Sequence, residues 1–309
     1  MIKTLTLNPA LDKTIIVEDF NLNNVNRIKE VFKDAGGKGI NVSKMLHNLD
    51  EKTKASGFLG GYTGQFIRSE LDKMGLNHDF IEIDDETRTN IKMVDRKQNT
   101  FTDLNEQGGQ VTANNLKELK QNIFADLKPN DILTLSGSIP PGVSNNIYTE
   151  LITTAKSKNI KTILDAEGEL FKKGVEAGPT IIKPNDHELS LYYNQVFTSL
   201  NEMIKAAENF FDFDIEMVML SLGEKGAIFL NRENTIKIEP LSIDVKSTVG
   251  AGDAMVAGLA LGLAKKLPVA EKVKLAAAAS SASLINNGTQ MGKQEEVEHF
   301  KQEIELKYL

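Results

Sequence analysis

Short, uninterrupted apolar runs alternate along the chain with longer segments of helical periodicity, and this alternation restricts the fold more than any other feature. Strands buried on both faces of a parallel sheet lack the polar alternation of half-exposed strands. Such strands are predicted at 2–7, 54–59, 132–136, 161–165, 180–183 and 217–221. Helices are predicted between them at 40–49, 63–74, 113–125, 145–158 and 199–211. The rhythm predicts an α/β fold with a mostly parallel sheet covered by helices on both sides.

Some segments break this rhythm, because they carry strand-like residues that no helix follows. They lie at 13–19, 27–33, 90–94 and 100–104, and a polar turn at 95–99 joins the last two as a hairpin. We expect a small antiparallel sheet to one side, which serves as a lid or as a partner surface. The chain then ends in helices at 251–265 and 269–285. Without a visible linker or repeat, residues 1–309 are expected to form one domain, with lid segments at about 12–34 and 87–108.

Composition excludes several classes of function. The 309 residues include 40% hydrophobic and 26% charged residues, an ordinary globular balance. A net charge of −7 disfavours binding along a nucleic-acid backbone. The absence of cysteine excludes disulfides, thiolate catalysis and zinc–thiolate sites. No apolar stretch fits a signal peptide or a membrane span, so we expect a cytoplasmic protein that does not enter a membrane.

The strongest local signal is the run Ser-Thr-Val-Gly-Ala-Gly-Asp at 247–253, which leads directly into a long apolar helical segment. The free amides at such a helix start, together with the helix dipole, attract anions. Gly250 and Gly252 let a phosphate approach the backbone closely. Asp253 in the first turn can accept a proton from a bound hydroxyl, or it can simply cap the helix. The residues alone favour neither role.

A second glycine-rich junction, Ala-Gly-Gly-Lys-Gly-Ile-Asn-Val-Ser at 35–43, also precedes a helical pattern. Lys38 can pair with a phosphate or hold a hydroxyl-rich ligand, and Asn41 offers both a donor and an acceptor. The alternative is a flexible turn with a solvated lysine. The spacing matches neither a Walker A loop nor a dinucleotide-binding glycine fingerprint.

Other candidates have structural alternatives of comparable weight. Asn185 and Glu188 follow a buried strand and suit Mg²⁺, but taken alone they favour a helix capping box. The glycine turn after Ser221 can border a nucleotide or join two strands of a hairpin. Arg88, which precedes the predicted lid strands, can clamp a phosphate bidentately or lie solvated on the surface.

Seven motifs in register resemble the ribokinase-like carbohydrate kinases of the phosphofructokinase-B branch, over nearly the whole chain. They are NPALD at 8–12, AGGKGINVS at 35–43, TRTNIK at 87–92, SGSIPPG at 136–142, IKPNDHEL at 182–189, SLGEKGA at 221–227 and STVGAGDAMVAG at 247–258. Within that branch they resemble bacterial 1-phosphofructokinases, with tagatose-6-phosphate kinases beside them. The resemblance implies a three-layer α/β/α sandwich with a small β-sheet lid, often shared across a homodimer.

The resemblance also implies roles for matched positions, with ATP and Mg²⁺ as the expected cofactors. Asp253 is implied to be the catalytic base, with Gly250, Ala251 and Gly252 forming an anion hole for the transferred phosphoryl group. The implied substrate contacts are Asp12, Gly37, Lys38, Asn41, Arg88 and Ser138, of which Arg88 and Lys38 hold the substrate's own phosphate. The implied nucleotide contacts are Lys183, Asn185, Ser221, Gly223, Gly226 and Asn286, and the implied metal contacts are Asn185 and Glu188.

The implied reaction is the phosphorylation of fructose 1-phosphate to fructose 1,6-bisphosphate by ATP. The alternatives are a tagatose-6-phosphate kinase, or a non-catalytic sensor of sugar phosphates. The chain departs from the family pattern at 165–168, where Asp-Ala-Glu-Gly replaces the usual Asp-[Ser/Thr]-Ser-Gly, and no role is assigned there. Exposed strands of the lid suggest a homodimer formed through them.

Overall fold

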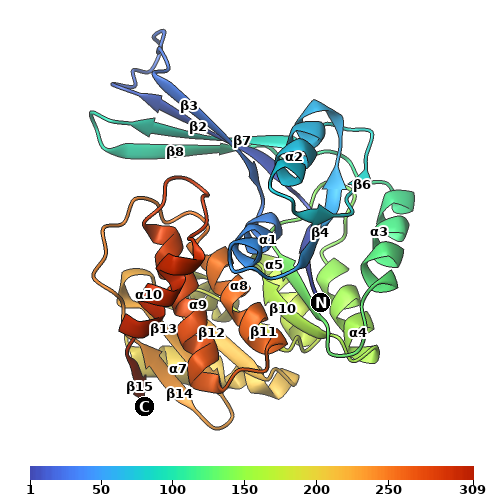
Figure 1. Ribbon diagram of the computed structural model, residues 1–309, viewed down its shortest axis with the longest axis vertical. Helices are drawn as coiled ribbons and strands as arrows, with labels where there is room; N and C mark the ends of the chain where they lie inside the picture. The colour runs from blue at the N-terminus through green and yellow to red at the C-terminus, as the bar shows by residue number, and fades with distance from the viewer.

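A computed structural model describes all residues from 1 to 309, and its largest feature is one central sheet (Figure 1). The sheet has 11 strands, and its main path runs β15-β14-β13-β12-β11-β10-β9-β1-β4-β5, with β6 also paired to β4. The strands from β12 through β1 to β4, together with the short strands β5 and β6, pair in parallel. At the other edge β12, β13, β14 and β15 pair in antiparallel orientation. The structure therefore confirms the predicted mostly parallel sheet.

The strands of this sheet are β1 (Ile2–Thr6), β4 (Thr53–Leu59), β5 (Asn77–His78), β6 (Ile81–Glu82), β9 (Ile132–Ser136), β10 (Lys161–Asp165), β11 (Ile181–Ile182), β12 (Met217–Ser221), β13 (Ala227–Asn231), β14 (Thr235–Ile238) and β15 (Leu306–Tyr308). The helices are α1 (Lys38–Asn48), α2 (Gly61–Lys73), α3 (Ala113–Ala125), α4 (Ile147–Ser157), α5 (Gly168–Glu176), α6 (Asp186–Tyr193), α7 (Leu200–Glu208), α8 (Ala251–Ala264), α9 (Val269–Leu284) and α10 (Gln294–Glu303).

Helices cover the sheet on both faces, which makes three layers. Successive strand residues enter opposite cores: Ile163 of β10 packs in the cluster that includes α1, α8, α9 and α10, and Leu164 packs in the cluster that includes α3 to α7. Two buried faces explain why these strands are continuous apolar runs in the sequence. No helix is both long enough and apolar enough to span a membrane.

Helices α8 and α9 pack closely because small residues line their contact. A Cβ atom added to Gly258 would lie 2.5 Å from the Cα atom of Ala276, so only glycine permits this approach of the two backbones. The approach places α8 against α9 on one side and against α1 on the other (Figure 1). The start of α8 is thereby fixed next to the start of α1.

A second sheet of 4 strands projects from the body (Figure 1). Its order is β3-β2-β7-β8, from strands β2 (Ala10–Val17), β3 (Glu30–Gly36), β7 (Arg88–Asp95) and β8 (Thr100–Asn105). The sheet was predicted to be antiparallel, but β2 pairs with β7 in parallel. Both strands run outward from the main sheet, so the chain returns through β3 and β8, which pair with them in antiparallel orientation.

Some element boundaries differ from the prediction. The helix predicted at 199–211 ends at Glu208 and continues as a short 3₁₀ helix, Asn209–Phe213. Ala227–Asn231 pairs with Met217–Ser221, which confirms the hairpin interpretation of the intervening glycine turn. Helices α5 and α10 had not been predicted, and of α6 only the capping box at its start had been indicated. Strands β14 and β15 were also missed, because they are short.

Candidate active site

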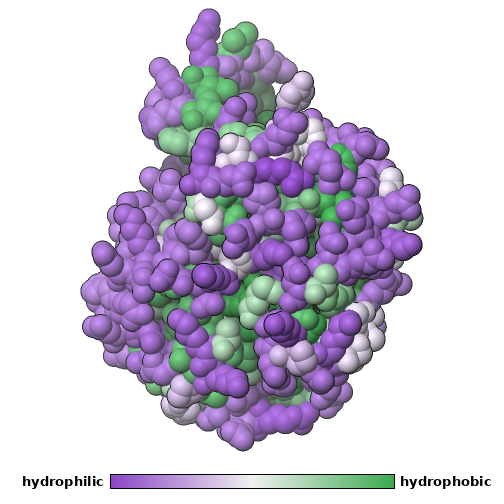
Figure 2. Space-filling model, turned by 45° about the vertical axis from the view of Figure 1, so that its right-hand side comes forward, coloured by the Kyte–Doolittle hydropathy of each residue, from purple (hydrophilic) through white to green (hydrophobic).

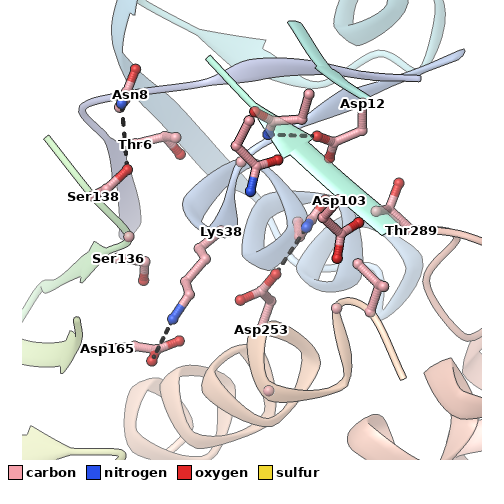
Figure 3. Close-up of a pocket in the computed structure, with 18 of the residues that line it drawn as sticks. Thr6, Asn8, Asp12, Lys38, Asp103, Ser136, Ser138, Asp165, Asp253 and Thr289 are labelled. Atoms are coloured by element: carbon pink, nitrogen blue, oxygen red, sulfur yellow. Dashed lines mark hydrogen bonds and ion pairs between the residues drawn. The ribbon is translucent and has the colours of Figure 1, made fainter. Parts of the chain in front are cut away.

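One pocket of about 600 Å³ lies at the carboxyl edge of the parallel strands, beneath the second sheet (Figure 3). Of its 29 lining residues only Val249 is hydrophobic, so the pocket suits a strongly polar ligand. Thr6, Ser136, Asp165 and Ser221 are the last residues of β1, β9, β10 and β12, and all line it. Ligands of open α/β sheets bind at this edge.

Buried polar atoms without hydrogen-bond partners concentrate in this pocket. The structure has eight such side-chain atoms, and seven belong to residues that line the pocket. These residues are Thr6, Asn41, Arg88, Asn90, Ser136, Asp165 and Thr289. Most buried polar groups in proteins are satisfied, so this concentration indicates a place where ligand atoms supply the missing partners.

The start of α8 opens into the pocket as an anion site. Gly250 is the N-cap residue, and its φ of 83° lies in the left-handed region that glycine adopts readily. No side chain caps this helix start, so the amides of its first turn have no side-chain partner. These donors and the positive end of the helix dipole face the pocket, where they can bind the oxygen atoms of a phosphoryl group.

Asp253 lies in that first turn and is 6% exposed. Its Oδ2 atom accepts a hydrogen bond of 2.8 Å from Nδ2 of Asn41, on α1. Burial first, and the nearby carboxylate of Asp165 second, raise the pKa of Asp253 to about 7, although Lys38 and the Asn41 hydrogen bond oppose the shift. A carboxylate with this pKa can accept a proton near neutral pH, as a general base must.

Two lysines bring positive charge to the same region. The Nζ atoms of Lys38 and Lys183 each lie 3.3 Å from Oδ1 of Asp165. The pKa of Lys38 is well above its usual range, chiefly because of the Asp165 carboxylate. The ammonium group of Lys38 therefore stays charged and can meet an anionic ligand at physiological pH.

The second sheet supplies the opposite wall of the pocket. Asn90 Nδ2 donates to Oδ1 of Asp12 at 3.0 Å. The two guanidinium Nη atoms of Arg88 donate to the carbonyl oxygens of Asn8, at 2.9 Å, and Glu106, at 3.2 Å. Arg88 is thus fixed in place, and its buried Nε atom has no partner.

Asn185 and Glu188 form the capping box of α6 that their spacing indicated. Asn185 Oδ1 accepts from the Glu188 amide at 2.7 Å, and Glu188 Oε2 accepts from the Asn185 amide at 2.8 Å. Both residues also line the pocket. No group of three acidic or histidine side chains is arranged to hold a metal ion by itself. Mg²⁺ commonly binds through one or two carboxylates, water and substrate phosphates, so this donor set fits it.

The pocket brings together most residues that the sequence indicated. Those lining it are Asp12, Gly37, Lys38, Asn41, Arg88, Ser138, Lys183, Asn185, Glu188, Ser221, Gly250, Gly252 and Asp253. Ala251 lies between Gly250 and Gly252 and contributes backbone, whereas Gly223 and Gly226 lie in the turn beyond Ser221. Asn286 does not line the pocket, and its Nδ2 atom donates to the carbonyl of Ala282 at 2.8 Å.

Some lining residues were not found from the sequence. Asp165 was given no role, although its position at the end of a buried strand was the signal that could have found it. Asn8 lies in the motif at 8–12, in which only Asp12 was predicted to contact the substrate. Thr289 belongs to a late segment with no motif of its own.

Comparisons with known proteins find relatives among carbohydrate kinases. The model of the pfkB family of carbohydrate kinases matches residues 5–296. A 1-phosphofructokinase of Borreliella burgdorferi is 36% identical over 92% of each chain, and a tagatose-6-phosphate kinase of Staphylococcus epidermidis is 38% identical over 85% of each. The crystal structure of phosphofructokinase-2 from Escherichia coli with substrates and products superimposes with a TM-score of 0.93, at 30% identity and 98% coverage of both chains.

The match to the family model and the likeness to solved phosphofructokinase structures identify a carbohydrate kinase with a ribokinase-like fold. The chain belongs to the pfkB family of carbohydrate kinases.

The raised pKa of Asp253 predicts how stability depends on pH. The folded state of this protein holds the proton of Asp253 more tightly than the unfolded chain does. The resulting stabilisation is fully present below the ordinary pKa of 3.8 and is lost as pH rises through about 7. Relative to the wild type, Asp253→Asn should therefore gain roughly 2–4 kcal/mol of unfolding free energy between about pH 4 and pH 8. Chemical denaturation across this range measures the difference.

The matched control is Asp186→Asn, which also removes a carboxylate from a first helical turn, but at an exposed position. Any change in its unfolding free energy across this range should be much smaller than that of Asp253→Asn, because water screens an exposed charge. A difference between Asp253→Asn and the wild type that stays constant across the range would contradict a raised pKa at Asp253.

Proposed function

We propose that the chain transfers the γ-phosphoryl group of ATP to fructose 1-phosphate and so forms fructose 1,6-bisphosphate and ADP. The observation that carries this proposal is the carboxyl group of Asp253, buried in the first turn of α8 beside the unbonded amides of that turn. In such a reaction the acceptor hydroxyl attacks the phosphoryl group directly. The group that accepts the hydroxyl proton and the amides that bind the phosphoryl oxygens must therefore face the same space. Membership in a sugar-kinase family implies ATP as the donor.

In the proposed mechanism, the acceptor hydroxyl lies between Asp253 and the γ-phosphate. Asp253 accepts the hydroxyl proton while the oxygen forms its bond to phosphorus, and the bond from phosphorus to the leaving oxygen of ADP breaks. The amides of Gly250, Ala251 and Gly252 stabilise charge on the phosphoryl oxygens, and each such preorganised donor is typically worth about 10²–10³ in turnover. The second sheet covers the reacting groups and excludes water, which would otherwise accept the phosphoryl group.

The nucleotide is proposed to lie along the edge formed by Lys183, Asn185 and Ser221, with the turn at Gly223 and Gly226 beyond it. Asn286 is still proposed as a nucleotide contact, although its side-chain amide donates a hydrogen bond to the carbonyl oxygen of Ala282. Glu188 and Asn185 would hold Mg²⁺, directly or through water, because one Glu188 oxygen stays outside the capping box. When bound, the ion neutralises charge on the phosphate oxygens.

The sugar phosphate is proposed to bind between the main sheet and the second sheet. The sugar hydroxyls would be contacted by Asp12, Gly37, Lys38, Asn41 and Ser138. The phosphate already present on the sugar would be held by Arg88 and Lys38.

Tagatose 6-phosphate is the second candidate substrate, because a tagatose-6-phosphate kinase is 38% identical to the chain. The deciding experiment measures ADP release with fructose 1-phosphate, fructose 6-phosphate and tagatose 6-phosphate. No release with any of them would favour a non-catalytic sensor.

Asp253→Asn is expected to lower kcat by about 10²–10⁴ and to leave ATP affinity nearly unchanged, because it removes only the proton acceptor. Coupled ADP-release kinetics give kcat, and calorimetry gives the dissociation constant for ATP. Near-normal turnover would rule out the base. A parallel loss of ATP binding would assign the residue to the nucleotide instead.

Arg88→Ala should raise KM for the phosphosugar about 10- to 100-fold, the worth of one hydrogen bond to a charged group, with little change in KM for ATP. Arg68→Ala is the matched control, since Arg68 pairs with Glu82 and does not line the pocket. Steady-state kinetics with each substrate varied in turn test this. Equal increases in both KM values would remove the phosphate-clamp role.

The second sheet is also proposed to join two copies of the chain. Cross-strand register places Ile15, Val31, Ile91, Met93 and Leu104 on one face. The opposite face carries Asp12, Thr14, Asn90, Lys92 and Asp103, which line the pocket. Hydrophobic residues are visible on this projecting sheet in Figure 2. An apolar sheet face that is open to solvent favours burial against a second copy.

Leu104→Asp should therefore weaken dimerisation at least about tenfold, because it places a charge on the apolar face. Leu191→Asp is a matched control on α6, since Leu104 is 59% exposed and Leu191 is 58% exposed. Sedimentation equilibrium measures both dissociation constants. A wild-type chain that sediments as a 34.0 kDa monomer at all concentrations would contradict the dimer.

A further inference from the structure

Asp165 is a fully buried charged residue of the pocket to which the proposed mechanism gives no role. It ends β10, is 1% exposed, and its Oδ1 atom lies 3.3 Å from the Nζ atoms of both Lys38 and Lys183. Figure 3 shows Lys38 extended from α1 toward this carboxyl group. Its other oxygen, Oδ2, is buried without a hydrogen-bond partner. One buried carboxylate therefore joins two ammonium groups from separate parts of the chain.

The ion pairs keep this carboxylate charged inside the protein. Burial by itself would raise the pKa of Asp165, but the ammonium groups of Lys183 and Lys38 together hold that pKa below its usual range. In return, the Asp165 carboxylate raises the pKa of Lys38. Two neighbouring ammonium groups would repel each other in such a site without an anion between them.

Both lysines lie beside the reaction centre. Lys38 is the first residue of α1, and Asn41 on the same helix donates to Asp253. The Nζ atom of Lys183 lies only 3.3 Å from the position of a Cβ atom added to Gly252, in the first turn of α8. Asp165 thus connects the ammonium group that follows β11 with the one at the start of α1.

Resting on the kinase function proposed above, we propose that Asp165 is a positioning residue. It holds the ammonium groups of Lys38 and Lys183 beside the first turn of α8, where the phosphoryl group is transferred. The triphosphate then meets two cations already in place, rather than lysines that must be ordered during the reaction. Preorganised charge of this kind acts on the transition state without reorganisation.

Other titratable groups surround this cluster, and none replaces Asp165. Asp253 of α8 and Glu188 of α6 act on Lys38 only through their charge, without a direct ion pair. The hydroxyl of Tyr148, on α4, donates to the carbonyl oxygen of Gly137 at 3.0 Å. Glu167 lines the pocket two residues after Asp165 and makes no ion pair.

The first test compares Asp165→Asn with the matched control Glu169→Gln, which removes an equal charge four residues later, at an exposed position outside the pocket. Asp165→Asn should lower kcat about 100-fold, since a misplacement of about 1 Å can have that effect. It should also move the acidic limb of the kcat/KM profile to lower pH, because the Asp165 carboxylate helps to raise the pKa of Asp253. Glu169→Gln should change neither quantity.

An acidic limb that stays in place, or a fall in kcat that Glu169→Gln shares, would overturn the positioning role. If Asp165→Asn does not fold, amine acylation of the wild-type chain decides. At mildly alkaline pH, Lys38 should react at least about tenfold more slowly than Lys13, which lines the same pocket and makes no ion pair. Peptide mass spectrometry gives both rates, and equal rates would overturn the proposal.

These outcomes separate the two proposals. A wild-type chain that releases no ADP with any sugar phosphate would contradict the kinase function, while slow acylation of Lys38 would still support its ion pair with Asp165. An active wild-type chain with an unshifted Asp165→Asn profile would contradict only the positioning role.

Discussion

The organisation of this protein depends on a buried cluster of opposite charges at the carboxyl edge of its sheet. Asp165 and Asp253 lie there with Lys38 and Lys183, two acidic and two basic side chains from four separate parts of the chain. Because each strand is buried on both faces, the strand side chains that can reach a ligand lie at its carboxyl end. The pocket therefore collects charged groups from strands that are far apart in the sequence.

The two carboxylates of this cluster have different environments. Asp165 has two ammonium neighbours and stays ionised, whereas Asp253 has an amide neighbour, Asn41, and its pKa is raised to about 7 by burial and by Asp165. Environments that move two carboxyl pKa values apart commonly mark distinct roles. Here one carboxylate fits the role of a fixed anion, and the other fits that of a proton acceptor.

The sequence predicted the main layers because long, buried elements have strong periodicity. It missed α5 and α10, which are short or lie in polar segments, and it missed the parallel pairing of β2 with β7, which depends on tertiary placement. Glycine motifs that mark helix starts indicated the pocket residues of α1 and α8, whereas Asp12, Ser138 and Lys183 were indicated only by the family resemblance. Asp165 was missed because its importance arises from Lys38 and Lys183, which only the fold brings together.

The most direct test of this account is a crystal structure with fructose 1-phosphate and a non-hydrolysable ATP analogue. The account predicts that a carboxyl oxygen of Asp253 lies within about 2.6–3.2 Å of the sugar hydroxyl that faces the γ-phosphate, as a general base must. It would be contradicted by a complex in which that hydroxyl contacts another group, while the Asp253 carboxyl remains bonded only to Asn41.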